Sequence, residues 1–246
     1  MIKLYFFILY FSFGFGQEEE ISAQDIIRKM DVNLNSKNRV LTSEMIIHGR
    51  RSSRTIKSKS WSVGMEQSFT ENLSPPREAG VKMLKIQDKL WTYSPQTDRV
   101  IQISGHMLRQ SMNGSDMSYK DMMETRPISE LYNLNLEGVA VIENRDHWII
   151  YMDAKIKGLS YPKRRVWIDK EYFLPIKEEL YAKSGKLLKT TKMRDIKKVQ
   201  GRWFPFHYMF KDELKRKSKG TEWIISDVEF DVDIPKSQFS KAQLRK

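Results

Sequence analysis

The stretch that decides the fold reads Leu90-Trp91-Thr92-Tyr93-Ser94-Pro95-Gln96-Thr97-Asp98-Arg99-Val100-Ile101-Gln102-Ile103, and Ser111-Met112-Asn113-Gly114-Ser115-Asp116-Met117-Ser118-Tyr119-Lys120-Asp121 follows it. Its first half predicts two strands, because aromatic and β-branched residues suit a half-buried strand. Pro95 has no N–H group for a strand interior and marks the turn between them. Gly114 predicts a bend, and Ser115 or Asp116 predicts a side-chain cap before a short amphipathic helix at residues 119–124.

The rest of the chain after residue 39 repeats this strand pattern. About a dozen segments alternate apolar and polar residues, and short turns such as Lys183-Ser184-Gly185-Lys186 join them, which predicts an antiparallel meander. One long helix is expected at residues 22–34, where apolar residues recur at helical spacing. We therefore expect a mainly β protein with a strongly curved antiparallel sheet, an incomplete β-barrel, and a few helices across its concave face.

Apolar side chains gather on one face of several predicted strands. Such rows form a packed core in most β proteins, but the predicted helices are too few to cover a broad sheet. We therefore expect a cleft, and thirteen methionines would suit its lining, because flexible thioethers adapt to apolar ligands. Both faces of the strand at residues 203–210 are apolar, and we choose the aromatic one. The residues expected to line the cleft are Trp91, Tyr93, Ile150, Met152, Phe204, Phe206 and Tyr208.

The first sixteen residues have the pattern of a secretory signal peptide. Lys3 precedes an apolar run at residues 4–11, and small residues precede the polar residues that begin at Gln17. We expect a signal peptide at residues 1–16 and a single domain at residues 17–246. Export would place a soluble protein in the periplasm. The chain has no cysteine, so neither a lipid anchor on cysteine nor a disulfide is expected.

Motifs for catalysis or for metal and cofactor binding are missing from the sequence. It has no Gly-x-Ser-x-Gly elbow, no phosphate-binding glycine loop and no dinucleotide fingerprint. Its four histidines lie far apart in sequence. We therefore expect no catalytic residue, no metal, no cofactor and no enzymatic activity. The net charge of +12 favours acidic surfaces as partners, although export argues against nucleic acid.

Two sets of short motifs carry a family resemblance. The first is Leu90-Trp91-x-Tyr93-x-Pro95 with Gly114-Ser115-Asp116-x-Ser118-Tyr119-x-Asp121. The second is Trp167-Ile168-Asp169, Leu174-Pro175, Gly201-Arg202-Trp203-Phe204-Pro205 and Asp233-Ile234-Pro235. In their order and spacing, from about residue 41 to 244, they resemble the LolA-like, outer-membrane lipoprotein-sorting-type family. Met117 stands where that family usually has phenylalanine.

The resemblance implies a half-barrel fold and a carrier function. It implies a protein that binds the acyl chains of a lipid or lipoprotein in a hydrophobic cleft and moves them across the periplasm towards the outer membrane. Gly114, Ser115, Asp116 and Tyr119 would form its lid-side loop. An inner-membrane exporter and an outer-membrane acceptor would be its partners, and the carrier itself would be a monomer. A secreted hydrolase acting on lipid or glycan, and a non-catalytic envelope assembly module, remain as alternatives.

Overall fold

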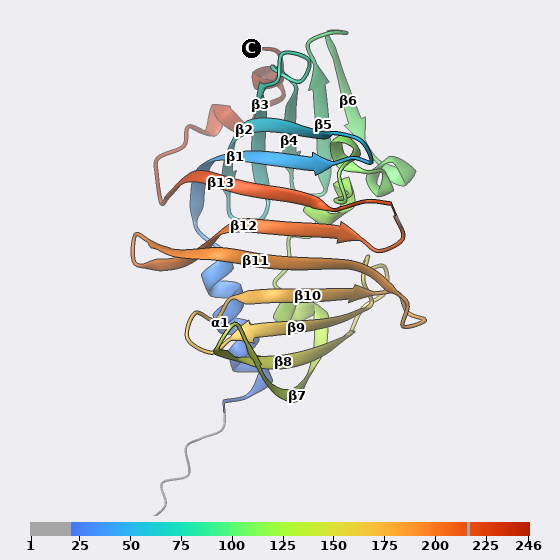
Figure 1. Cartoon of the computed structure of the whole chain (residues 1–246). Helices are drawn as coiled ribbons and strands as arrows, with labels where there is room; N and C mark the ends of the chain where they lie inside the picture. Colours follow the sequence, from blue (N-terminus) through green and yellow to red (C-terminus); the bar gives the residue numbers. More distant parts are fainter. Residues whose placement is uncertain (1–20, 216) are drawn as a thin grey trace, which may run out of the picture.

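One antiparallel sheet of 13 strands dominates the computed structural model, which describes residues 21–215 and 217–246. The sheet does not close into a barrel, and Figure 1 shows its strands changing direction strongly from one edge to the other. The predicted mainly β fold with an open, curved antiparallel sheet is therefore confirmed. The signal peptide predicted at residues 1–16 lies outside the described residues.

The strands run in the order β6-β5-β4-β3-β2-β1-β13-β12-β11-β10-β9-β8-β7. Their bounds are β1 (Asn38–His48), β2 (Ser53–Val63), β3 (Gln67–Ser74), β4 (Lys82–Ile86), β5 (Lys89–Ser94), β6 (Arg99–Ile103), β7 (Tyr132–Ile142), β8 (Arg145–Ala154), β9 (Lys163–Asp169), β10 (Pro175–Tyr181), β11 (Leu187–Val199), β12 (Arg202–Asp212) and β13 (Thr221–Phe230). Two meanders therefore meet where β1 pairs with β13.

This strand order forces one connection to cross the whole sheet. β6 and β7 follow each other in the chain but form opposite edges of the sheet. The residues between them, 104–131, are called the crossing segment here. It contains three 3-10 turns, η1 (Gly105–Arg109), η2 (Met112–Gly114) and η3 (Tyr119–Met122), and the short helix α2 (Ile128–Leu131). The helix predicted at residues 119–124 is thus a 3-10 turn, shorter than expected.

Helix α1 (Ala23–Leu34) covers the β7–β9 end of the sheet, and Figure 1 shows it behind these strands. The Ser22 hydroxyl caps the helix by accepting the Asp25 N–H at 3.1 Å. Ile26, Ile27 and Met30 form one fully buried stripe. The stripe packs against Ile150, Met152, Val166 and Ile168 of β8 and β9. Every helix that the structure describes is too short or too polar to span a lipid bilayer.

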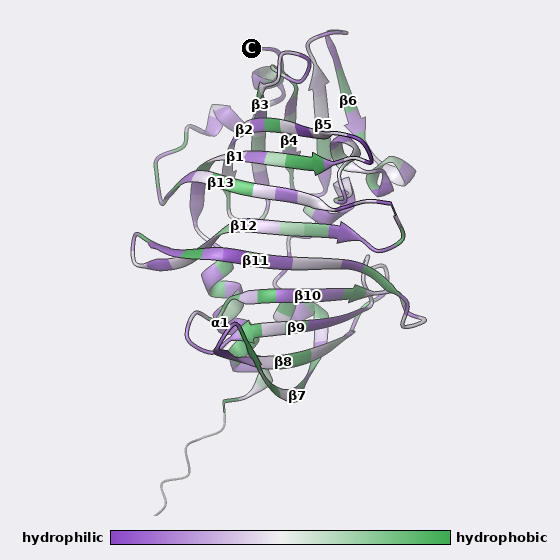
Figure 2. Ribbon diagram, in the orientation of Figure 1, coloured by the Kyte–Doolittle hydropathy of each residue, from purple (hydrophilic) through white to green (hydrophobic). Residues whose placement is uncertain are grey.

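The two faces of the sheet carry different clusters, and Figure 2 shows apolar and polar residues alternating along several strands. The concave face, which α1 covers, also carries a central cluster around Leu41, Phe204 and Tyr208. The outer face carries a third cluster, in which Phe69 and Leu84 pack under the C-terminal turns η4 (Lys236–Phe239) and η5 (Lys241–Arg245). The C-terminal residues therefore cover the outer face of the meander that β1–β6 form.

Candidate functional site: two cavities under the crossing segment

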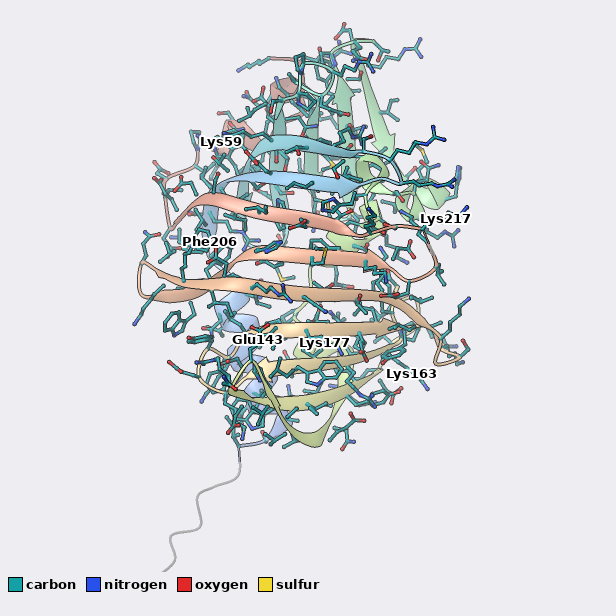
Figure 3. The ribbon with its side chains drawn as sticks, viewed as in Figure 1. Lys59, Glu143, Lys163, Lys177, Phe206 and Lys217 are labelled. Atoms are coloured by element: carbon teal, nitrogen blue, oxygen red, sulfur yellow. The ribbon has the colours of Figure 1, made fainter. Side chains whose placement is uncertain are left out.

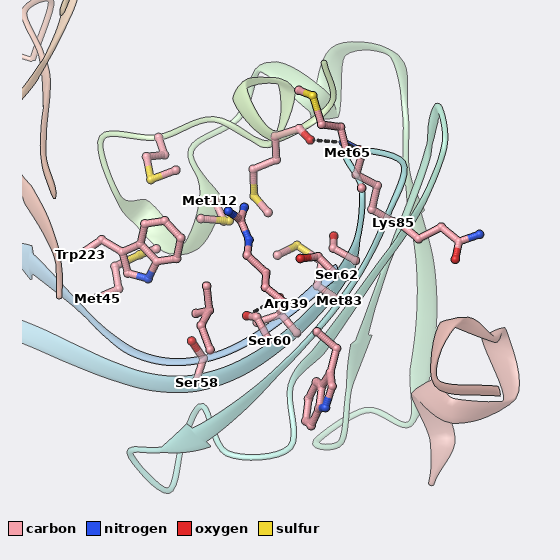
Figure 4. Close-up of a pocket in the computed structure, with 18 of the residues that line it drawn as sticks. Arg39, Met45, Ser58, Ser60, Ser62, Met65, Met83, Lys85, Met112 and Trp223 are labelled. Carbon is pink, nitrogen blue, oxygen red and sulfur yellow. Dashed lines mark hydrogen bonds between the residues drawn. The ribbon is translucent and has the colours of Figure 1, made fainter. Parts of the chain in front are cut away.

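A cavity of about 310 Å³ lies between β1–β4, the end of α1 and the crossing segment. Figure 4 shows its lining, with sulfur atoms facing the space from several sides. Six of the thirteen methionines contribute to it, so we call it the methionine cavity. They are Met45, Met65, Met83, Met112, Met117 and Met122. Such a lining can adapt to the shape of an apolar ligand.

The floor of the methionine cavity is built by strand alternation. Leu41 pairs with Ser60, and Met45 pairs with Ile56, so these β1 and β2 side chains share the concave face. Ser58 and Ser62 lie on the same face of β2, because alternate residues point the same way. Serine is too small to fill the space that a leucine would fill in a packed core. The row of serines therefore leaves room for a ligand.

Two cations line this cavity. The Arg39 guanidinium donates to the Leu34 carbonyl at 3.3 Å, and the Lys85 ammonium donates to the carbonyls of Met65 at 2.9 Å and Met122 at 2.6 Å. Glu124 is the one carboxylate among the described lining residues, and it forms an ion pair with Arg126 at 2.8 Å. Burial lowers the pKa of Lys85, against a smaller opposing effect of Glu124. The cavity thus has an excess of positive charge.

A second cavity of about 300 Å³ lies between β9–β12 and the same crossing segment. Two ion pairs line it: Lys189 contacts Asp121 at 2.6 Å, and Arg164 contacts Glu178 at 3.0 Å. Its apolar lining includes Leu131, Tyr132, Leu180 and Phe210. The two cavities share Met65, Met117 and Glu124, so they are neighbours divided by the crossing segment.

The structure does not bring the seven predicted cleft residues together, and none of them lines either cavity. Trp91 and Tyr93 belong to the outer-face cluster, where the Lys241 ammonium lies 4.5 Å from the centre of a Trp91 ring. Ile150 and Met152 are fully buried under α1. The expectation of one shared cavity is therefore wrong as geometry. The reason is the phase of the strand: Met83 pairs with Thr92, so residues 90 and 92 share its face and Trp91 does not.

The aromatic face of β12 lies on the concave side, as chosen from the sequence. Tyr208 pairs with Trp223, which lines the methionine cavity, and Phe210 lines the second cavity. Phe204 and Phe206 pack edge to face at 5.8 Å between ring centres. These rings therefore belong to the central cluster, and Phe210 is the member of the row that reaches a cavity.

The loop motif fastens the crossing segment to the β12–β13 hairpin. Gly114 ends η2 with a φ of +74°. The Asp116 carboxylate is buried and accepts hydrogen bonds from the Asp212 N–H at 3.2 Å, the Ser218 hydroxyl at 3.0 Å and the Thr221 hydroxyl at 2.8 Å. Two further contacts tie the motif locally: the Ser115 hydroxyl accepts the Met117 N–H at 3.2 Å, and the Tyr119 N–H donates to the Gln110 carbonyl at 3.2 Å.

Asp121 fastens the other end of the segment to β11. Burial alone raises the pKa of its carboxyl, but the charge and hydrogen bond of Lys189, with bonds from Tyr161 and the Ser118 N–H, outweigh burial and hold the pKa below its ordinary value. A carboxyl with a lowered pKa stabilises the fold at neutral pH, and this contribution is lost as the pH falls through the lowered pKa.

Replacing Lys189 with methionine should therefore destabilise the fold at neutral pH by about 1.5 kcal/mol, since Asp121 keeps its burial and loses its cation. The difference from the unaltered protein should shrink below about pH 4, where the carboxyl of the variant is protonated in both states. Urea unfolding at several pH values measures this. Lys186→Met, in an exposed turn, is the matched control. A pH-independent loss would contradict the role given to Asp121.

Two histidines that lie far apart in sequence meet at one carboxylate on the outer face. His48 Nε2 lies 2.6 Å from one Glu222 oxygen, and His207 Nε2 lies 2.7 Å from the other. The hydrogen bond from His48 is the main cause that lowers the pKa of Glu222. Among the described residues, no group of three or more His, Asp or Glu side chains is placed to hold a metal ion. The cluster joins β1, β12 and β13.

Comparison with known proteins identifies the family. A family model described as "Uncharacterized protein" matches residues 64–246. The chain belongs to this family. Among curated proteins, the search found no match.

Solved structures with the same fold cover nearly the whole chain. A putative outer membrane lipoprotein-sorting protein domain from Vibrio parahaemolyticus is similar at a TM-score of 0.80 and 23% identity, over 91% of this chain and 98% of that one. A DUF1329 family protein from Desulfovibrio piger is similar at a TM-score of 0.82 and 22% identity, over 90% of this chain and 97% of that one. A LolA superfamily protein from Nitrosomonas europaea is similar at a TM-score of 0.71 and 22% identity, over 91% of this chain and 100% of that one. The resemblance indicated by the sequence motifs is therefore confirmed at the level of the fold.

Proposed function

We propose that this protein is a non-catalytic periplasmic carrier that binds the acyl chain of a lipid or lipoprotein in the methionine cavity and moves it towards the outer membrane. The observation that carries the proposal is a cavity lined by six methionines on the concave face of a LolA-like sheet. The name of the similar lipoprotein-sorting domain supports the same kind of cargo. An inner-membrane exporter and an outer-membrane acceptor would load and unload a monomeric carrier.

The energetics favour such a carrier. Each CH₂ group moved out of water gains about 0.8 kcal/mol, so a chain of about sixteen carbons represents on the order of 13 kcal/mol. An acyl chain therefore does not cross an aqueous compartment alone. Transfer from a membrane into the methionine cavity is a transfer between two apolar surroundings, so loading and release can be nearly balanced.

Mass spectrometry of an organic extract from the natively purified protein tests the proposal directly. A carrier should bring acyl lipids with it in a stoichiometric amount. An assembly module would bring none, and a hydrolase would convert added lipid or glycan to product. Extracts without acyl lipid, together with no binding of added fatty acid, would refute the carrier proposal.

A carboxylate introduced among the methionines of the cavity should weaken acyl binding. Met83→Glu would place a carboxylate against the hydrocarbon chain of the ligand. We expect the affinity for a fluorescent fatty acid to fall at least about tenfold, because an ion in apolar surroundings is costly. Arg39 and Lys85 line the same cavity and can offset the new charge, so circular dichroism should stay unchanged. Met107→Glu in η1 is the matched control, since Met107 is half-buried and lines neither cavity. Full binding by a folded Met83→Glu protein would place the acyl site elsewhere.

A further inference from the structure

One row of side chains crosses the floor of the methionine cavity with a cation at each end. Arg39 pairs with Ser62, Ser62 pairs with Ser68, and Ser68 pairs with Lys85. Directly paired residues share a face, so the four side chains form a line across β1, β2, β3 and β4, and all four line the cavity. Three strand spacings separate its ends, about 14 Å between backbones. Figure 4 shows Arg39, Ser62 and Lys85 around one part of the pocket.

The two serines of this row have free hydroxyls, unlike their neighbours. Ser60 and Thr70, one step along the same strands, bond each other at 2.9 Å, and Ser43 bonds Ser58 at 3.3 Å. In the described part of the chain, the hydroxyls of Ser62 and Ser68 have no hydrogen-bond partner. Two unpaired donors therefore lie between two cations.

Neither cation has a carboxylate within ion-pair distance among the described residues. Arg39 spends one of its five N–H donors on the Leu34 carbonyl, and Lys85 has one donor left after its two carbonyl bonds. Arg39 bonds the Leu34 carbonyl and Arg202 bonds the neighbouring Asn35 carbonyl, so capping of α1 uses only one donor of Arg39. A buried charge without a counter-charge is costly, so such groups are normally paired. The missing counter-charge is what a ligand could supply.

We propose that the methionine cavity takes an amphiphile whose chain lies among the methionines and whose anionic head group, a carboxylate or a phosphate, is bound by Arg39, Lys85, Ser62 and Ser68. The inference rests on the proposed carrier function and narrows its cargo. Arginine binds both kinds of oxyanion in a bidentate manner, lysine adds a point charge, and the hydroxyls donate to the remaining oxygens. A cargo without a negative group would leave both cations without a carboxylate or phosphate within ion-pair distance.

Competition between two ligands that differ only in the head group tests this. Hexadecanoate and hexadecanol should each displace a fluorescent fatty acid from the unaltered protein at about pH 8, with hexadecanoate binding at least about tenfold more tightly. Arg39→Gln, and the double variant Ser62→Ala with Ser68→Ala, should reduce this preference several-fold and leave hexadecanol binding in place. Arg202→Gln is the matched control, since Arg202 caps the same helix end and lies outside the cavity lining. Its preference should equal that of the unaltered protein.

The outcomes separate the two proposals. Equal binding of acid and alcohol by the unaltered protein would overturn the anionic head group and leave the carrier proposal standing. Binding of neither would overturn both. Inorganic phosphate should displace the fluorescent fatty acid only at concentrations far above those of hexadecanoate, because it lacks the chain. Equal potency of phosphate and hexadecanoate would mean that the row binds anions without any contribution from a chain, which would overturn the proposal. The ligand comparison needs no variant, so an unfolded Arg39→Gln protein would not prevent a decision.

Discussion

Met152→Lys should unfold the protein, with a loss of at least about 5 kcal/mol, which is a large part of the stability of an ordinary domain. Met152 is fully buried under α1, and its strand partner is Arg164. The new ammonium would be desolvated beside an existing guanidinium whose carboxylate partner is Glu178. Circular dichroism and urea unfolding measure the loss.

The matched control for this variant is Met209→Lys. Met209 is half-buried on the outer face of β12, opposite Glu222, so its replacement should change stability by less than about 0.5 kcal/mol. A folded Met152→Lys protein of normal stability would mean that α1 does not cover β8 in solution. In the open cleft that the sequence predicts around Met152, a lysine could reach water and the protein would stay folded. The burial of Met152 under α1 reverses this expectation.

Asp116→Ala should cost about 3 kcal/mol. A lost helix cap costs about 1 kcal/mol, but Asp116 accepts three hydrogen bonds in a buried site, and alanine would leave the Asp212 N–H and the Ser218 and Thr221 hydroxyls without an acceptor. The crossing segment should also detach from the β12–β13 hairpin, so amide hydrogen exchange around residues 112–118 should accelerate.

Asp116→Asn keeps the shape and one acceptor oxygen, and the two hydroxyls can turn to accept its N–H groups. This variant should lose less than half as much stability as Asp116→Ala. Equal losses for both would indicate that the negative charge, and not the three bonds, holds the segment. Unchanged stability in both would contradict the fastening role altogether.

Periodicity in the sequence was enough to predict the strands and α1, and the family resemblance added the open, curved form of the sheet. Alternation identifies strands whatever face they bury, and the stripe of Ile26, Ile27 and Met30 defines a helix with one buried side. Short turns between most neighbouring strands also made an antiparallel meander the natural expectation. These features depend on local residue order, which a sequence displays directly.

The site could not be predicted in the same way. Which face of a strand points inward depends on its pairing with other strands. If the pairing register shifted by one residue, Trp91 and Thr92 would exchange faces. The serines of β2 look like a solvent-facing row, yet they line the methionine cavity because small side chains leave it empty. His48 and His207 meet at Glu222 only because β1 joins β13 in the folded sheet.

The crossing segment begins at one edge strand, β6, and ends at the other, β7, so it spans the concave side of the sheet as a chord spans an arc. Its span is fixed by the arc of the sheet, and Asp116 and Asp121 pin it at intermediate points. If the sheet flattened, its two edges would move apart and the crossing segment would be pulled closer to the concave face. If the sheet curved more strongly, the segment would be under less tension. The distance between the crossing segment and the concave face, which sets the depth of both cavities, therefore changes together with the curvature of the sheet. A partner that only grips the outer face of the sheet could thus change the room available to a ligand on the other side.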